Sequence, residues 1–359
     1  MSLPRSVPVV LFCLLPIPMA PVATIAAQDG QKHDLKFRAE KGFKTWYRIA
    51  TTQETAIQIM GQDMNQQMEL VHEVELEITS VAADGAAEFE IRYLSARGSL
   101  ELPMVGLVEF DTREDDDAED DNPMSSQVRR GLTQWVGKCA RGKLDAKGRL
   151  VAMPGLAEGV AKAAGQGGMG RTMTAQFTDA ASLQRQVGEL FARLPENPIA
   201  IGGSFGAEET HAIGGGTRMT TVATGKLDKI DGDVAVLTFK GTITAAAPSE
   251  TPDAADDGDP AARMRRSMRV ENGKFEGEER IDRKTGWKVG SKSKSTMAMS
   301  MASPMGGEER MQMSSTTTSN VERLPAKPAG AKAAPAPAPA TGADKSTDKA
   351  PAKSSGDGR

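Results

Sequence analysis

The string GGSFG, from Gly202 to Gly206, places a serine where hydrolases of the α/β class carry their nucleophile. That chemistry needs a strand before Ser204, a helix after it, and histidine and acidic partners brought close by the fold. The residues after Ser204 alternate like a strand instead, and the histidine that follows it is His211. A serine hydrolase at Ser204 is therefore an alternative hypothesis, and the glycine-rich start of a β module is the favoured interpretation.

Methionine is the second residue type that could do chemistry, because the chain holds 19 of them. Met297, Met299 and Met301 alternate along one strand-like segment, and Met311 and Met313 follow after a glycine-containing turn. Thioether sulfur binds Cu(I), so these five residues form a candidate copper site. The competing explanation is that methionine fills an irregular core or lines an adaptable apolar groove.

The groove explanation predicts a ligand surface on one face of a sheet. Met60, Met64 and Met68 are the counterpart of the later methionines in an earlier strand. A lipid or another apolar small molecule could lie against such a face. The predicted lining residues are Met60, Met64, Met68, Leu70, Leu76, Met297, Met299 and Met301.

Two further strings resemble ligand sites. GQGGMGRT, at residues 165–172, fits a phosphate-loop spacing, but it follows a predicted helix rather than a strand, which favours a linker. The acidic run at residues 114–121 lacks the glycine and the spaced terminal glutamate of an ordered calcium loop. Neither string predicts a cofactor, and we expect none.

Composition excludes several classes of function. The chain has 3 His and 2 Cys, too few for a zinc site built from clustered ligands. Its net charge of −4 and its 4% aromatic residues speak against a nucleic-acid surface. Cys139 has no histidine near it in sequence, and we expect it to be a buried strand residue. We therefore expect a protein that is not an enzyme.

The two ends of the chain indicate where it works. Residues 1–27 have the basic start, apolar stretch and small residues of a secretory signal, which predicts an exported, periplasmic or extracellular protein. After cleavage we expect no membrane span. Residues 325–359 are rich in Ala, Pro and Lys, which predicts a disordered tail. This tail has a net charge of +3 and could contact an anionic envelope polymer.

Between the ends, alternation with a period of two residues predicts strands. From Met68 to Ile78, apolar residues alternate with Glu69, Glu73, Glu75 and Glu77, which predicts a half-buried strand with a charged solvent face. The Asp84-Gly85 turn then predicts a hairpin.

The same plan appears twice. A strand from Thr217 to Ile230, the Asp231-Gly232 turn and a return strand repeat the first hairpin. KLDAKGRLV, at residues 143–151, matches RIDRKTGWKV, at residues 280–289. Two copies of one antiparallel β unit follow from these matches.

Helices are predicted between the strand-forming segments, because residues 125–136 and 181–194 carry apolar residues at helical spacing. The predicted fold is mainly β (α+β), with two tandem antiparallel curved-sheet or half-barrel modules and a few packed helices. The predicted divisions are a signal (1–27), module one (34–155), a helical and glycine-rich connector (156–200), module two (201–324) and the tail (325–359).

The chain also resembles a known family. The features that carry the resemblance are the signal, KGFKTWYRIAT at residues 41–51, IMGQDMNQQMEL at residues 59–70, a Gly-Lys strand before the LDAKGRLV hairpin, and a degenerate second copy. They are similar to an uncharacterised family of exported bacterial proteins, often lipoproteins, catalogued as a domain of unknown function. The resemblance covers residues 34–324 and implies no activity. Unlike the lipoprotein members, this chain has no cysteine at the end of its signal.

Overall fold

The computed structural model describes residues 30–59, 62–102, 106–114, 123–156, 180–213, 217–246, 269–302 and 310–329. Its strands are β1 (Lys32–His33), β2 (Lys44–Ile59), β3 (Gln62–Val81), β4 (Ala87–Leu102), β5 (Gly106–Asp111), β6 (Cys139–Leu144), β7 (Leu150–Ala152), β8 (Ile199–Ala200), β9 (Ser204–Ile213), β10 (Thr217–Asp231), β11 (Val234–Ala246), β12 (Arg269–Asp282), β13 (Lys288–Ala302) and β14 (Arg310–Leu324). The described helices are α1 (Pro123–Thr133) and α4 (Ala180–Gly188).

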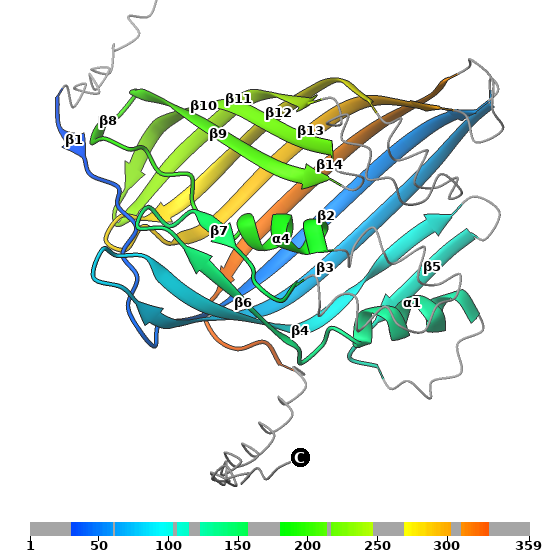
Figure 1. The fold of residues 1–359 in the computed structure, drawn as a ribbon, viewed down its shortest axis with the longest axis horizontal. Coiled ribbons are helices and arrows are strands. Elements are labelled where there is room, and N and C mark those ends of the chain that lie inside the picture. The colour runs from blue at the N-terminus through cyan, green and yellow to red at the C-terminus, as the bar shows by residue number, and fades with distance from the viewer. Residues whose placement is uncertain are drawn as a thin grey trace, which may run out of the picture.

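One antiparallel sheet of 12 strands dominates the molecule, in the order β7-β6-β4-β3-β2-β14-β13-β12-β11-β10-β9, with β5 paired to β4. The sheet is strongly curved, and both of its edges turn toward α4 (Figure 1). A separate pair, β1 and β8, lies at one end of the large sheet. The predicted mainly-β fold is confirmed.

The strands of the two predicted repeats occupy the two halves of this one sheet. β2, β3, β4, β6 and β7 follow one another in the first half, and β9 to β13 follow one another in the second. The last strand, β14, joins the halves by pairing with β13 on one side and β2 on the other. The division into domains stays a prediction, and the predicted signal, the segment 157–179 and the tail beyond residue 329 lie outside the described residues.

Two glycines allow the sheet to curve where β4 and β11 approach their neighbours. A Cβ on Gly98 of β4 would lie 1.9 Å from the carbonyl oxygen of Glu69. A Cβ on Gly241 of β11 would lie 2.2 Å from the carbonyl oxygen of Val222. Only a residue without a side chain fits such a close backbone approach.

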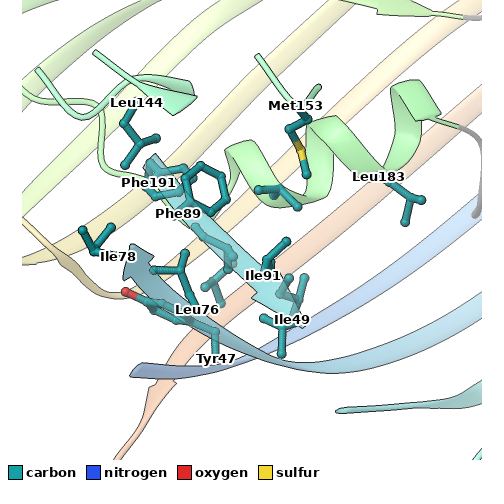
Figure 2. Close-up of a cluster of buried hydrophobic side chains, with 14 of the residues drawn as sticks. Tyr47, Ile49, Leu76, Ile78, Phe89, Ile91, Leu144, Met153, Leu183 and Phe191 are labelled. Atoms are coloured by element: carbon teal, nitrogen blue, oxygen red, sulfur yellow. The ribbon is translucent and has the colours of Figure 1, made fainter. Parts of the chain in front are cut away.

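The inner face of the sheet, defined as the side that carries Tyr47, Ile49 and Val321, packs against α4. Leu183, Val187 and other residues of and after the helix bury their side chains among those of β2, β3, β4 and β14 (Figure 2). The helical period of the α4 sequence puts these residues on one stripe, so the helix buries an apolar side against the sheet. α4 ends at Gly188, earlier than the predicted residue 194.

One end of the curved sheet is closed by the segment before β2. The backbone N–H of Arg38 donates to Thr285, and the indole Nε1 of Trp287 donates to the carbonyl of Arg38 at 3.2 Å. Phe37 and Phe43 pack on Trp287, with ring centroids 5.0 and 4.8 Å away. This aromatic cluster covers the inner face of the sheet at that end.

A second helix covers another part of the inner face. Val128 and Leu132 of α1 are buried against Met68, Leu100 and Val108 of β3, β4 and β5. The predicted helix at residues 125–136 is thus present, but it starts at Pro123 and ends at Thr133.

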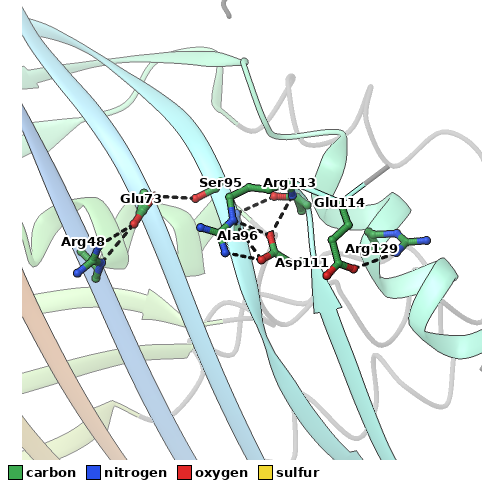
Figure 3. Close-up of polar contacts among 9 residues, drawn as sticks. Arg48, Glu73, Ser95, Ala96, Asp111, Arg113, Glu114 and Arg129 are labelled. Carbon is green, nitrogen blue, oxygen red and sulfur yellow. Dashed lines mark hydrogen bonds and ion pairs between the residues drawn. The ribbon is translucent and has the colours of Figure 1, made fainter. Parts of the chain in front are cut away.

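The outer face of the first half carries charged side chains, and two of them are buried rather than solvated as predicted. Glu73 and Glu75 are 4% and 8% exposed. The Nη2 of Arg48 lies 3.0 Å from Glu73, and the Oγ of Ser95 donates to the same carboxylate at 3.1 Å (Figure 3). The indole of Trp46 donates to Glu75 at 3.0 Å. The alternation correctly predicted that both glutamates lie on the outer face. Side chains from the neighbouring strands hydrogen-bond to the two carboxylates and bury them.

The prediction for Cys139 is wrong. Its side chain is exposed on β6, and the Nε of Arg92 on the neighbouring β4 lies 3.1 Å from its sulfur. Cys139 lies opposite Arg92, and Arg92 lies opposite Glu75, so the thiol is on the outer face of the sheet.

Candidate functional site

A row of apolar side chains crosses the inner face at the end opposite the aromatic cluster. Met299 of β13 lies opposite Met313 of β14, Met313 lies opposite Ile57 of β2, and Ile57 lies opposite Met64 of β3. Directly paired residues project on the same side of a sheet. The alternation of β14 puts Met313 on the side of Val321, and hence on the inner face. We call this set of four residues the methionine row.

Three more methionines flank the row, two of them toward the strand ends and one toward the middle of β13. Met301 pairs with Met311, and Met297 lies two residues before Met299 on the same face of β13. Met299 and Met311 are 8% and 9% exposed, whereas Met64, Met297, Met301 and Met313 are half-buried. None of the three core clusters formed by the described residues includes a methionine of β13 or β14. Of the predicted facing methionines, Met299 and Met301 lie opposite Met313 and Met311 in the register, whereas Met297 lies opposite Ser315.

The other predicted lining residues have different positions. Met68 is packed beneath α1, and Leu76 is fully buried beside Tyr47 and Phe89. Leu70 is 3% exposed on the same strand. Met60 lies outside the described residues. The structure thus groups Met64 with the later methionines and puts the remaining β3 residues into or beside the core.

From the methionine row, small polar residues lead along β13 toward α4. Ser291, Ser293 and Ser295 share the face of Met297, and all four are half-buried. Their opposite residues on β14 are also small, namely Val321, Ser319, Thr317 and Ser315. The inner face therefore carries only small side chains along this stretch, and Ser315, Ser319 and Val321 of β14 are buried there.

This strip ends at a buried group of charges. Lys288 and Glu279 are 1% and 2% exposed, and their side chains are 3.0 Å apart. The guanidinium of Arg193 donates to Glu279 at 2.7 Å and to Glu209 of β9 at 2.8 Å. Arg193 also stacks over Phe275, 5.1 Å from the ring centroid. Charges buried to this extent are tolerated only when they are paired in this manner.

Local structure explains why Lys288 faces inward. Ile281 pairs with Lys288 while Arg280 pairs with Gly290, so a β-bulge leaves Val289 as the extra residue. A bulge changes the side to which the following residues point. Lys288 consequently reaches the end of α4, where its Nζ donates to the carbonyl of Glu189 at 2.7 Å. A cation is favoured there because the last carbonyls of a helix lack intrahelical partners.

The electrostatics of the group follow from this pairing. Burial by itself would lower the pKa of Arg193, but the neighbouring carboxylates of Glu209 and Glu279 more than offset it and raise the pKa. Arg193 is therefore charged near pH 7. Two cations, Arg193 and Lys288, face two carboxylates, Glu279 and Glu209, so their charges balance.

A small cavity of about 40 Å³ adjoins the charged group. Its lining includes Arg193, Phe275, Gly277, Lys288 and Ser293. A polar cavity of this size has room for a water molecule or for the polar end of a ligand. It opens beside the serine strip that leads to the methionine row.

A second cavity, of about 10 Å³, lies between α1, α4 and the sheet. It is lined mainly by apolar residues, among them Tyr93, Leu132 and Leu183, together with His72. Neither ring nitrogen of His72 has a hydrogen-bond partner among the described residues. Burial lowers the pKa of His72 to about 4, so the ring is neutral near pH 7.

The serine hydrolase alternative does not fit the geometry. Ser204 and His211 lie in the same strand, β9, and seven residues of extended chain separate them by about 23 Å. A strand, not a helix, follows Ser204. The nucleophile arrangement that the GGSFG string resembles is therefore absent at Ser204.

The sequence reasoning missed the group of Arg193, Glu279 and Lys288. One signal was present, because Glu279 shares its alternation with Phe275 and Ile281, which are apolar. A charged residue on the apolar side of a strand indicates a buried pair. Lys288 had no such signal, since its direction depends on the bulge.

A family model matches residues 84–288 of the chain, and its description is "Family of unknown function (DUF6263)". The match covers more than half of the chain. The chain belongs to the DUF6263 family. The expected domain of unknown function is thereby confirmed. No curated protein matches this DUF6263 chain.

Solved structures resemble this DUF6263 member only weakly. One is described as "Lipid-protein interactions in lipovitellin", with 11% identity, a TM-score of 0.36, and coverage of 80% of this chain and 26% of the other. This chain thus spans about a quarter of that lipovitellin chain. A putative outer membrane lipoprotein-sorting protein domain from Vibrio parahaemolyticus matches at 10% identity and a TM-score of 0.14, covering 79% of this chain and 87% of that domain.

The outer membrane protein OprG from Pseudomonas aeruginosa matches at 6% identity and a TM-score of 0.17, covering 82% of this chain and all of OprG. These TM-scores are too low to support a functional argument for the DUF6263 chain. Among its described helices, none is long and apolar enough to cross a membrane. The described residues also contain no group of three or more His, Cys, Asp and Glu side chains that could hold a metal ion.

Proposed function

We propose that this protein is an exported, non-catalytic binding protein that holds a lipid or another apolar molecule against its inner sheet face. The observation that carries the proposal is the methionine row, Met299–Met313–Ile57–Met64. It lies on the inner face, is mostly half-buried, and belongs to none of the core clusters of the described residues.

The chemistry of the row supports an apolar ligand. Methionine side chains are flexible and polarizable, so they adapt to ligands of irregular shape. A partly exposed line of apolar side chains is favourable when a partner removes it from water. Next to the row, Ser291, Ser293 and Ser295 of β13 are small and half-buried, so a partner can approach the sheet along this strand.

Export rests on the predicted signal at residues 1–27, and the cationic tail at residues 325–359 supports a contact with an anionic envelope polymer. Such a contact would keep the binding face close to membranes, where apolar molecules are abundant.

The proposal is tested by native mass spectrometry of the protein purified from its own envelope. We expect a bound mass that organic extraction releases as lipid. The Met313→Glu variant puts a charge in the row and is expected to lose that mass, whereas Gln312→Glu, on the exposed outer side of the same strand, is expected to keep it. No bound mass in the unmodified protein, or equal loading of the two variants, would contradict the proposal.

Copper binding is a second candidate function, favoured by one observation. Met299 pairs with Met313 and Met301 pairs with Met311, so four thioethers gather on two adjacent strands. Paired residues have Cα atoms about 5 Å apart, which allows two sulfur atoms to share one Cu(I) ion. Titration with Cu(I) tests it, and binding no tighter than millimolar would remove it.

A further inference from the structure

The charged group beside α4 and the methionine row lie at the two ends of one continuous surface. Along the inner face of β13 the order is Ser291, Ser293, Ser295, Met297, Met299 and Met301. Ser293 lines the cavity of about 40 Å³, and Met299 belongs to the methionine row. The six residue steps from Ser293 to Met299 span about 20 Å of extended strand. One elongated molecule can therefore contact both ends.

The cavity end is equipped for a polar group. An ammonium group has three N–H donors, and Lys288 uses two of them on Glu189 and Glu279. A third donor is left for an acceptor placed in the cavity. Because the site is buried, a hydrogen bond to such an acceptor is stronger than the same bond in water.

The charge of the site determines which acceptor fits. Arg193 and Lys288 are already neutralised by Glu279 and Glu209, and the carboxylate of Glu189, whose Oε2 accepts from Ser319 at 2.6 Å, adds a negative charge at the rim. With Glu189 included, three carboxylates face the two cations among these side chains, so an anionic head would add to an excess of negative charge. Hydroxyl and ester oxygens accept hydrogen bonds without this cost.

We propose that the cavity beside Lys288 binds the uncharged polar head of an amphiphile, such as an acylglycerol, whose chain lies along β13 to the methionine row. The inference rests on the proposed function and adds the ligand class and orientation to it. The head accepts a hydrogen bond from Lys288, and the chain covers Met297 and Met299.

The test compares two probes of equal chain length, monopalmitoylglycerol and palmitate, titrated into the full chain. We expect the neutral glyceride to bind at least tenfold more tightly than the anion. Ser293→Leu fills the cavity and should weaken glyceride binding at least tenfold. Lys294→Leu, the exposed neighbour on the outer face, should leave it unchanged. Thermal unfolding of each variant shows that it is folded.

The outcomes separate the inference from the proposed function. If palmitate binds as tightly as the glyceride or more tightly, the head-group assignment is overturned, while the apolar binding function stands. The same holds if folded Ser293→Leu binds the glyceride normally. If neither probe binds the unmodified chain, both the inference and the proposed function fail. The probe comparison needs no variant, so it decides the matter even if Ser293→Leu does not fold.

Discussion

Met299 on β13 and Met313 on β14 lie directly opposite each other on the inner face of the sheet. They are 14 residues apart in sequence, and the strand pairing makes them neighbours. The same pairing continues through Ile57 to Met64, which comes from the other half of the sheet. This contact between the halves exists because β14 lies between β13 and β2.

Replacing Met299 and Met313 together by leucine separates the two candidate functions. Leucine keeps the apolar character and nearly the volume of methionine, so stability and apolar-ligand binding should change little. It has no thioether, so any Cu(I) binding that uses this pair should weaken at least tenfold. Parallel titrations of the variant with Cu(I) and with an apolar probe measure both. Loss of the apolar probe with retention of copper would reverse our assignment.

His72 should make the stability of the protein depend on pH. Its folded-state pKa is about 4, below the ordinary value of 6.5, so the unfolded chain binds more protons between these values. Stability should therefore be intact above about pH 6.5 and fall by about 3 kcal/mol as the pH drops to 4. Urea unfolding at several pH values measures this. In His72→Leu that part of the decline should be missing, and an identical decline in both proteins would contradict the prediction.

Removing the charge of Lys288 should lower the free energy of unfolding. Lys288→Met leaves the buried carboxylate of Glu279 with fewer partners, and we expect a loss of about 3 kcal/mol in the free energy of unfolding. Adding Glu279→Gln should recover part of this loss, because residues of one network are not additive. Lys292→Met, on the exposed side of β13, should change stability by less than about 0.5 kcal/mol. Equal effects at positions 288 and 292 would mean that the pairing is not stabilising.

The curvature of the sheet should depend on Gly98. A Cβ there meets the backbone of Glu69 at 1.9 Å, so Gly98→Ala should cost about 2–3 kcal/mol. Gly206 of β9 is the matched control, since a Cβ on it meets nothing within 4 Å. Gly206→Ala is expected to stay within about 0.5 kcal/mol of the unmodified protein. Chemical denaturation of the two variants gives the comparison, and a tolerated Gly98→Ala would show that the backbones can separate there.

Much of the fold could be predicted from local patterns. Alternation along β3 and β10, and the Asp-Gly turns after them, correctly predicted antiparallel hairpins, because side-chain direction in a strand has a period of two residues. The glycines of both turns, Gly85 and Gly232, have positive φ angles of 91° and 57°. For the same reason, Met299 and Met301 were correctly predicted to face methionines of β14, but Met297 faces Ser315.

The sequence alone determined the mainly-β class, the repeated hairpins and the side of each strand on which the methionines lie, since these depend on neighbouring residues. Only the tertiary structure decided which strands became neighbours. The pairing of β14 with β2 brings Met64 to Met313, and α1 buries Met68. The bulge at Val289 turns Lys288 inward to meet Glu279 and the end of α4. Contacts between distant segments and single-residue changes in register leave no periodic signal, so they arise only when the whole sheet is assembled.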